Sequence, residues 1–359
     1  MTDSHHSTEQ PEQVEQAVTP EQVEQPVTPE QPPAKRAVIA PSPGEVITSE
    51  ATGFSYEMGE LIGEGSFGLV FACTDGWGNN LAAKIMKPVG SYEHVRDAAL
   101  AELRRLVLLR HPHITYVYDA FEYRDTFYII TERCYCPLTR LFTLQDLDGR
   151  AWITPIARCL LQAVQYLHIN RYAHQDIHLN NVFVVFARNE MIPTDPGAVH
   201  FKLGDLGVSK LFEELDAANT LAEWIRPPEA IEPAEFGPLD HRIDIYHLGL
   251  IFLQLGYNKE IRFSHEERLA GRPREMALEL PPPLNFALEK TLRRHAPLRT
   301  ESAAELWRDL HSPPGLPEEP TAAQVETARQ QATESEATPS VEPDPGRPAD
   351  PPLPGSRPA

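Results

Sequence analysis

A glycine-rich stretch between two strand-like runs is the first segment whose residue types suggest chemistry. It extends from Gly63 to Val70 and has further glycines at Gly65 and Gly68. Glycine has no Cβ, so such a turn can bring backbone N–H groups close to a phosphate. Hairpins without a ligand share this spacing, and so do dinucleotide-binding loops, although those open a helix rather than a second strand. The motif alone leaves these interpretations open.

A lysine lies in the middle of the next apolar strand. Lys84 follows Ala82 and Ala83, and an ammonium group there is costly to bury unless it meets an anion or a carboxylate. The helix expected from Ser91 to Arg110 offers Glu102, which is flanked by an apolar stripe of leucine and valine. We expect a Lys84–Glu102 pair. The alternative is that Glu102 lies on a solvated face.

The order of these residues resembles the small lobe of the eukaryotic-type (Hanks-type) Ser/Thr protein kinase family. A His-Pro-His-Ile segment begins at His111, nine positions after Glu102, as at the helix-to-strand junction of that family. The resemblance runs from about Phe54 to Leu310. It implies an α+β, two-lobed protein kinase fold, with a small antiparallel β lobe carrying one helix and a larger, mainly helical lobe. It also implies ATP and Mg²⁺ as cofactors.

Two loop motifs resemble the catalytic and metal-binding segments of the family. The segment from His174 to Asn181 matches the catalytic loop, so the resemblance gives Asp176 the role of accepting the substrate hydroxyl proton and Asn181 a place at a magnesium ion. The segment from Gly204 to Gly207 stands where the metal-binding aspartate motif belongs, with leucine in place of the usual phenylalanine. Asp205 is then the principal metal ligand.

The resemblance also implies contacts to the nucleotide. The segment from Ile129 to Cys134 is similar to the hinge, with Thr131 as the gatekeeper and the backbone of Glu132 and Cys134 facing adenine. Lys84 is expected to clamp the α- and β-phosphates. The expected nucleotide-binding residues are Gly63, Glu64, Gly65, Ser66, Gly68, Val70, Ala82, Lys84, Thr131, Glu132, Cys134 and Phe183.

Three further matches concern the architecture of the large lobe. The segment from Arg226 to Glu229 resembles the end of the activation segment, and the segment from Asp244 to Gly249 resembles the central helix. Arg299 matches the buried partner of Glu229. Small-molecule phosphotransferases lack this substrate-docking region, so the resemblance implies protein substrates.

The chain departs from the family pattern near the catalytic aspartate. Gln175 replaces the arginine that would hold a phosphate on the activation segment, so we expect activity without phosphorylation there. Ser209 and Thr220 are the only hydroxyl candidates in that segment. His178 replaces a lysine, and Ala222 replaces the threonine that normally bonds to it. His178 could still donate to the γ-phosphate.

These residues predict an ATP-dependent protein kinase that phosphorylates Ser or Thr. The expected catalytic residues are Asp176, Lys84, Glu102 and His178. The changes at Gln175, His178 and Ala222 motivate an alternative, a pseudokinase or ATP-binding scaffold with little or no catalysis. The missing lysine and threonine at positions 178 and 222 also weaken the usual distinction from tyrosine specificity.

Composition separates two tails from the middle of the chain. The formal net charge is −20, and residues 1–52 hold nine acidic and two basic residues while residues 312–359 hold eight and three. The first tail carries a nine-residue Pro/Gln/Glu repeat that begins at Pro11 and again at Pro20, so we expect both tails to be disordered. The catalytic domain is expected at residues 53–311, with lobes of about 53–133 and 134–311.

Charge and hydropathy also limit the expected partners and location. The acidic balance argues against nucleic acid, which requires clustered Lys and Arg. Pro351 to Pro354 could dock on a polyproline-recognition partner, although a plain spacer has the same composition. The four cysteines show no paired spacing, so reduced thiols are expected. We find no signal peptide and no run of roughly 18 apolar residues, and so we expect a cytoplasmic protein without a membrane partner.

Overall fold

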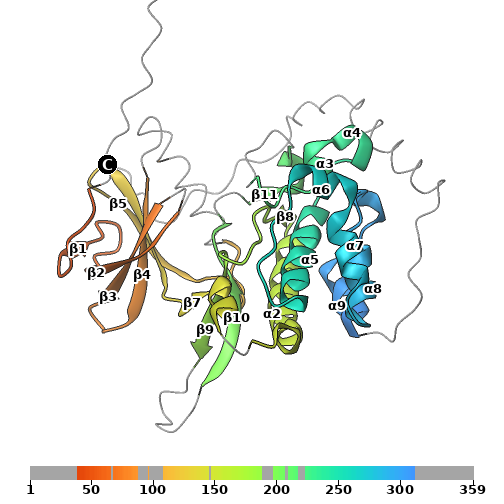
Figure 1. Ribbon diagram of the computed structural model, residues 1–359. Coiled ribbons are helices and arrows are strands. Elements are labelled where there is room, and N and C mark those ends of the chain that lie inside the picture. The colour runs from red at the N-terminus through yellow and green to blue at the C-terminus, as the bar shows by residue number, and fades with distance from the viewer. Residues whose placement is uncertain are drawn as a thin grey trace, which may run out of the picture. The chain divides into compact units, whose positions relative to one another are not determined.

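A six-stranded antiparallel sheet forms the N-terminal part of the described chain (Figure 1). The computed structural model describes residues 39–65, 68–87, 96, 108–144, 147–187, 197–206, 209–216 and 223–311. The sheet has the order β1-β2-β3-β4-β6-β5. Its strands are β1 (Val46–Thr48), β2 (Ser55–Glu64), β3 (Gly68–Asp75), β4 (Asn80–Met86), β5 (Val117–Tyr123) and β6 (Thr126–Glu132).

One face of this sheet carries its own core. Tyr56 stacks on Phe121 with ring centroids 5.9 Å apart, and Phe121 stacks on Tyr128 at 5.6 Å. Aromatic and β-branched side chains suit such a half-buried pleated surface. The predicted helix from Ser91 to Arg110 lies almost wholly outside the described residues.

Strand β1 corrects the predicted N-terminal boundary. It pairs antiparallel with β2, and Ile47 is buried in the core of the sheet. Thr52 Oγ1 also donates a hydrogen bond to Asp119 Oδ2 at 2.7 Å. Residues 46–52 therefore belong to the fold, although the sequence placed residues 1–52 in a tail. A three-residue strand is too short to display the alternation by which strands are recognised.

The rest of the described chain is mainly helical. The long helices α2 (Gly149–Ile169) and α5 (Arg242–Gly256) lie side by side. Shorter helices are α3 (Pro228–Ile231), α4 (Pro233–Phe236), α6 (His265–Ala270), α7 (Arg272–Leu278), α8 (Leu284–Thr291) and α9 (Ala303–His311). Short 3₁₀ turns are η1 (Leu138–Thr143), η3 (Phe212–Glu214) and η4 (Ala296–Leu298).

Two small sheets lie within this helical part. One has the order β10-β9-β7, from β7 (Cys136–Pro137), β9 (Val182–Ala187) and β10 (Ala198–Leu203). The other pairs β11 (Lys210–Leu211) with β8 (Tyr172–Ala173). Apolar periodicity in the sequence predicts helices at 153–168 and 243–255 and strands at 182–186 and 199–203, and α2, α5, β9 and β10 occupy these positions. The expected two-lobed α+β fold is confirmed.

Helix α5 is the centre of the helical part. All of its residues except Arg242 are buried, which is typical of a helix surrounded by protein. Gly249 allows close packing, because a Cβ there would lie 2.7 Å from the Thr291 side chain of α8. Helix α2 begins at the N-cap Asp148, whose side chain accepts from the Ala151 amide.

A buried ion pair ties the start of α3 to the segment before α9. Arg299 donates to both carboxylate oxygens of Glu229 at 2.5 Å, and neither side chain is exposed. This confirms the predicted partner of Glu229. Loss of either member would leave an unpaired buried charge, which costs about 3–5 kcal/mol.

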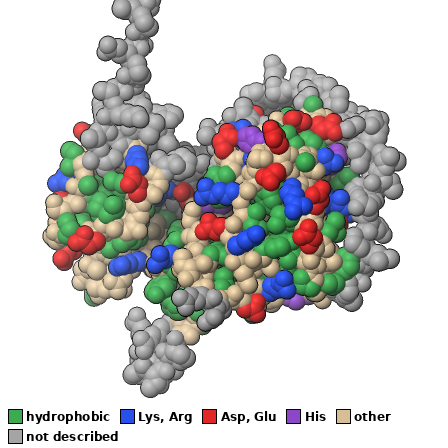
Figure 2. Space-filling view, viewed as in Figure 1, with side chains coloured by type: hydrophobic (Ala, Val, Ile, Leu, Met, Phe, Trp, Pro, Cys, Tyr) green, Lys and Arg blue, Asp and Glu red, His purple; other side chains and the backbone are tan. Residues whose placement is uncertain are grey.

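The surface carries charges of both signs. Basic and acidic side chains are interspersed on the face in Figure 2. All four cysteines are free thiols. Within the described ranges, no helix combines the length and apolar character needed to span a bilayer.

Truncation tests the corrected boundary. Deletion of residues 1–52 should lower the free energy of unfolding by about 3 kcal/mol or more, because Ile47 is no longer buried and Asp119 loses a donor. Deletion of residues 1–38 removes none of the contacts described here and should shift the melting temperature by less than about 2 °C. Thermal unfolding of both variants and the full chain measures this, and equal melting temperatures for all three would contradict the role of β1.

Candidate functional site

The buried carboxylate of Asp244 holds the start of the candidate catalytic loop. It accepts the backbone N–H groups of His174 and Gln175, each at 2.8 Å, and a bond from His168 Nε2 at 2.9 Å. Gln175 has a positive φ of 68°, a costly conformation for a residue with a Cβ. Burial raises the pKa of Asp244, but the His168 hydrogen bond and the nearby histidines hold that pKa below its usual range.

His174 links the catalytic loop to the segment after β10. Its Nδ1 accepts the Asp176 N–H at 3.3 Å, which requires that Nδ1 carry no proton. Nε2 then holds the proton and donates to the Gly204 carbonyl at 3.0 Å. The Gly204 N–H donates to the Asn181 carbonyl at 2.9 Å. These bonds bring Asp176, Asn181 and Asp205 to one place.

Asp176 presents one oxygen without a partner. Asn181 Nδ2 donates to the Asp176 carbonyl and to Oδ2, both at 2.9 Å, whereas Oδ1 is buried without a hydrogen bond in the described structure. Burial raises the pKa of Asp176, but the bond from His178 and the surrounding histidines hold it below the usual value. Asp176 is therefore an ionised acceptor with one free oxygen, which suits a hydroxyl donor.

The ring of His178 is held from two sides. Its Nδ1 accepts the Asn180 N–H at 3.2 Å, and Nε2 lies 3.4 Å from Asp176 Oδ2. The Trp224 ring lies against it with centroids 4.8 Å apart, and the Arg262 guanidinium lies over Trp224 at 5.4 Å. The sequence analysis did not single out Trp224 or Arg262.

The segment that carries Trp224 is anchored to helices α5 and α6. His247 Nε2 bonds to the Ile225 carbonyl at 3.1 Å, and Arg268 Nη2 donates to the Glu223 carbonyl at 2.8 Å. Burial, opposed by nearby carboxylates, lowers the pKa of His247 to about 4. The ring is therefore neutral near pH 7, where Nε2–H acts as the donor. The residues before and after Trp224, Glu223 and Ile225, are thus each held by a hydrogen bond to a helix.

Lys84 and Asp205 form an ion pair at the edge of this group. Lys84 Nζ lies 3.0 Å from Asp205 Oδ1, with 16% and 28% of the two side chains exposed. Burial raises the pKa of Asp205, whereas the Lys84 charge and hydrogen bond lower it below its usual range. Glu102, the predicted partner of Lys84, lies outside the described residues.

The glycine-rich turn joins β2 to β3. A Cβ at Gly68 would lie 2.5 Å from the Ile85 carbonyl, so only glycine fits there. Lys87 Nζ donates to Glu64 Oε1 at 2.8 Å and to the Gly65 carbonyl at 2.9 Å. Lys87 was missed by the sequence analysis, although it lies three residues after Lys84. Ser66 lies outside the described residues.

The predicted adenine contacts lie on neighbouring strands. Thr131 is paired with Ala82 across β6 and β4, and Val70 is paired with Lys84 across β3 and β4. The Glu132 carboxylate is paired with Lys202 Nζ, at 2.6 and 2.8 Å, and accepts the Tyr116 N–H at 2.7 Å. The Glu132 N–H donates to the Tyr116 carbonyl at 2.9 Å, so neither group is offered to a ligand.

Two more predicted adenine contacts flank this region. The Cys134 N–H has no hydrogen bond to the rest of the described chain. Burial raises the pKa of the Cys134 thiol to about 12, so the thiol stays protonated. Phe183 lies under Gly204, where a Cβ would come within 2.6 Å of its ring.

These residues fit a magnesium nucleotide. No group of three or more His, Cys, Asp and Glu side chains in the described ranges is arranged to hold a metal ion. A divalent ion here would take ligands from Asp205, the Asn181 amide oxygen and the phosphate oxygens, because Mg²⁺ prefers hard oxygen donors. Asp176 Oδ1 is the remaining acceptor of this group without a hydrogen-bond partner among the described residues.

Comparison with known proteins agrees with this geometry. The protein kinase domain family matches residues 56–306. Over 205 residues the chain is 27% identical to cyclin-dependent kinase D-1 of Arabidopsis thaliana, covering 55% of this chain and 47% of that protein. Over 210 residues it is 28% identical to serine/threonine-protein kinase TAO3 of Rattus norvegicus, covering 56% and 22%.

A third relative is cyclin-dependent kinase-like 1 of Caenorhabditis elegans, 26% identical over 207 residues, with 56% of this chain and 54% of that protein covered. The matched region thus spans about half of the length of these curated relatives, or less. The family match itself covers more than half of this chain. The chain belongs to the protein kinase family.

Proposed function

We propose that this protein transfers the γ-phosphoryl group of ATP to Ser or Thr hydroxyls of protein substrates. The observation that carries the proposal is the free, ionised oxygen of Asp176 beside Asn181 and Asp205. Phosphoryl transfer needs little covalent chemistry from a protein. It needs positioned acceptors, cations and metal ligands.

Each residue of the group has a proposed role. Asp176 Oδ1 accepts the hydrogen of the substrate hydroxyl and orients its oxygen toward the phosphate. Lys84 binds the α- and β-phosphates, and Glu102 is proposed to hold Lys84. Asn181 and Asp205 would hold Mg²⁺, which when bound neutralises phosphate charge.

The nucleotide base is proposed to bind at the hinge. The Cys134 N–H, which has no partner among the described residues, would donate to adenine, and the Glu132 carbonyl would accept. The proposed surfaces on either side of the base are Val70 and Ala82 above it and Phe183 below it. The glycines at 63, 65 and 68 would let the turn approach the phosphates.

Activity is proposed not to require phosphorylation of the activation segment. The Ser209 hydroxyl is fully buried and has no hydrogen-bond partner, so a kinase has no access to it in this conformation. Pairing of β11 with β8 already orders the start of the segment. Asp244, rather than a phosphate, fixes the backbone at Gln175. The other candidate, Thr220, lies outside the described residues.

His178 is proposed to take over part of the role of the family lysine. Its Nε2 faces Asp176, next to the proposed phosphate position, and Trp224 holds the ring where the family has a threonine contact. An aromatic contact therefore replaces a hydrogen bond. Trp224 acts on the reaction only through His178, as a positioning residue.

Residues 312–359 are proposed to be an acidic tail, with the proline-rich end as a weak polyproline ligand. A cytoplasmic location and a lobe boundary near residue 133 are proposed as well. Nucleic acid is not a proposed partner.

Two substitutions test the enzyme proposal. Lys84→Met and Asp205→Asn should each lower phosphoryl transfer by more than about 100-fold, because each removes charge that faces the nucleotide. Lys259→Met, at an exposed position, is the matched control. Transfer of radiolabelled phosphate to generic basic and acidic proteins measures the loss, with EDTA removing the metal.

The result also decides between an enzyme and a scaffold. If the unaltered protein binds ATP but transfers no phosphate, the pseudokinase alternative replaces the proposal. If Lys84→Met or Asp205→Asn turns over at the original rate, the assigned roles are wrong.

A second experiment tests the positioning role of Trp224. Trp224→Leu should lower kcat about 10-fold and leave KM for ATP within about twofold, because the His178 ring loses its support. Trp224→Phe should restore most of kcat, and Trp77→Leu, whose ring is 86% exposed, is the control. A purely structural role would lower the melting temperature and leave kcat unchanged, and that outcome would refute the assignment.

A further inference from the structure

The guanidinium of Arg268, in α6, is buried with most of its donors unused. Only 1% of the residue is exposed, and Nη2 donates to the Glu223 carbonyl at 2.8 Å. Nε and Nη1 have no hydrogen-bond partner among the described residues. Buried donors normally have partners, and a charged one without any is costly. Arginine keeps its charge in proteins, so this site is incomplete as it stands.

Two neighbouring residues also have buried polar atoms without hydrogen-bond partners within the described part of the chain. Arg226 Nε and the Tyr246 hydroxyl are also buried without partners in the described structure. Arg226 Nη1 lies 3.8 Å from Glu223 Oε1, so both arginines meet at Glu223. Burial raises the pKa of the Tyr246 hydroxyl, and the charges of Arg299 and Arg268 oppose that rise. We call Arg226, Tyr246 and Arg268 the arginine cluster.

The cluster holds a concentration of unsatisfied polar atoms. Four of its side-chain atoms, Arg226 Nε, the Tyr246 hydroxyl oxygen and Arg268 Nε and Nη1, are buried without a hydrogen-bond partner among the described residues. Arg299, which lies over the Tyr246 ring at 4.6 Å, is already paired with Glu229. The excess positive charge therefore comes from Arg226 and Arg268.

Glu223 neutralises the positive charge of the arginine cluster only in part. Its carboxylate is 69% exposed, and it lies closer to His265 Nε2, at 2.8 Å, than to Arg226. A carboxylate so exposed can turn away into water at little cost. Arg226, with 23% of its side chain exposed, then becomes the entrance to the cluster. Glu223 thus marks the position that another anion would occupy.

The cluster lies close to the proposed acceptor site. Arg226 follows two residues after Trp224, which touches His178, and His178 lies against Asp176. An extended peptide advances roughly 3.3–3.6 Å per residue. A substrate side chain near Arg226 would therefore belong to a residue a few positions from the hydroxyl that meets Asp176.

We propose that the arginine cluster binds an anionic side chain of the protein substrate, a phosphorylated residue or a carboxylate, within about one to four positions of the acceptor. This proposal rests on the proposed kinase function. Two guanidinium groups offer paired N–H donors that match the oxygens of a phosphate or carboxylate, and a partly desolvated site strengthens such bonds. The bound anion would displace Glu223 and supply the missing acceptors.

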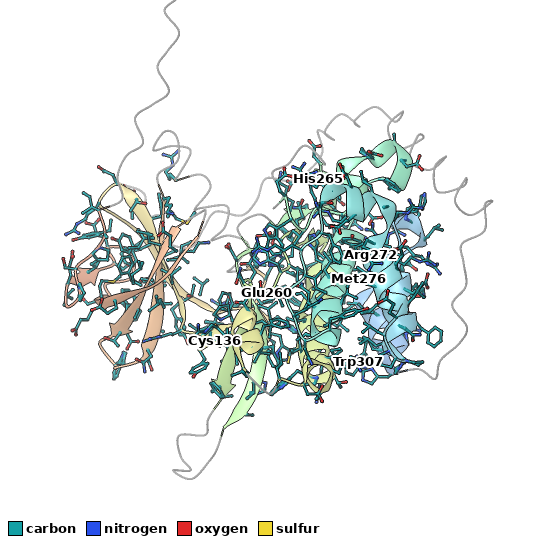
Figure 3. The ribbon with its side chains drawn as sticks, viewed as in Figure 1. Cys136, Glu260, His265, Arg272, Met276 and Trp307 are labelled. Carbon is teal, nitrogen blue, oxygen red and sulfur yellow. The ribbon has the colours of Figure 1, made fainter. Side chains whose placement is uncertain are left out.

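Inorganic phosphate tests the site without any assay of activity. At matched ionic strength, phosphate should raise the melting temperature of the full chain more than chloride does. Arg226→Gln and Tyr246→Phe should lose most of this rise, and Glu223→Gln should increase it. Arg272→Gln, on the neighbouring helix α7, is the matched control, since its pairing with Glu275 does not involve the cluster. His265 and Arg272 are both marked in Figure 3. Equal phosphate responses in all variants would overturn the site.

Peptide pairs distinguish the sources of the anion. Ser peptides that carry phosphoserine, Glu or Gln at one of the four positions on either side of the acceptor should differ in kcat/KM by about 10-fold or more. Arg226→Gln should abolish this preference and keep the rate on the Gln peptide. A preference that persists in Arg226→Gln would refute the cluster as its origin. If no peptide is phosphorylated but the phosphate response depends on Arg226, the anion site stands and the kinase proposal fails.

Discussion

The carboxylate of Asp244 is the constraint on which the candidate site depends. It comes from the middle of the fold, on the buried helix α5, and it accepts two consecutive backbone N–H groups of the catalytic loop. Those two bonds fix the direction of the chain immediately before Asp176. They also compensate the strained φ of Gln175, a position that the backbone would otherwise avoid. The positions of Asp176, Asn181 and Asp205 follow from that anchor through His174 and Gly204.

Burial of charge is a recurring device in this protein. Asp244 and the Glu229–Arg299 pair are fully buried and fully bonded, so each fixes one segment against the helical core. The arginine cluster differs because its charges are buried while their bonds are incomplete. Continuum arguments give little net stability to buried ion pairs, but a large penalty to unpaired ones. Asp244 and the Glu229–Arg299 pair therefore hold the fold together, whereas we infer that the arginine cluster receives a ligand.

Much of the fold could be predicted from the sequence, because helices α2 and α5 and strands β9 and β10 carry clear apolar periodicity. The buried Glu229–Arg299 pair also followed from motif order. The start of the fold was misplaced, since β1 is too short to show a pattern. The contact of Trp224 with His178 joins residues 46 positions apart in the sequence, and no local signal indicates such a contact. Lys87 and Lys202 were missed for the same reason, because their partners Glu64 and Glu132 lie 23 and 70 positions away in the sequence.

Amide hydrogen exchange in Asp244→Asn tests most directly whether this carboxylate positions the site. Asparagine has a similar size but lacks the charge, and it can accept only one of the two loop amides well. We expect the His174 and Gln175 amides to exchange at least about 10-fold faster in the variant, while the core amides of α2 stay protected. Unchanged protection of His174 and Gln175 in a folded Asp244→Asn protein would contradict this expectation, because the loop would then be held by something else.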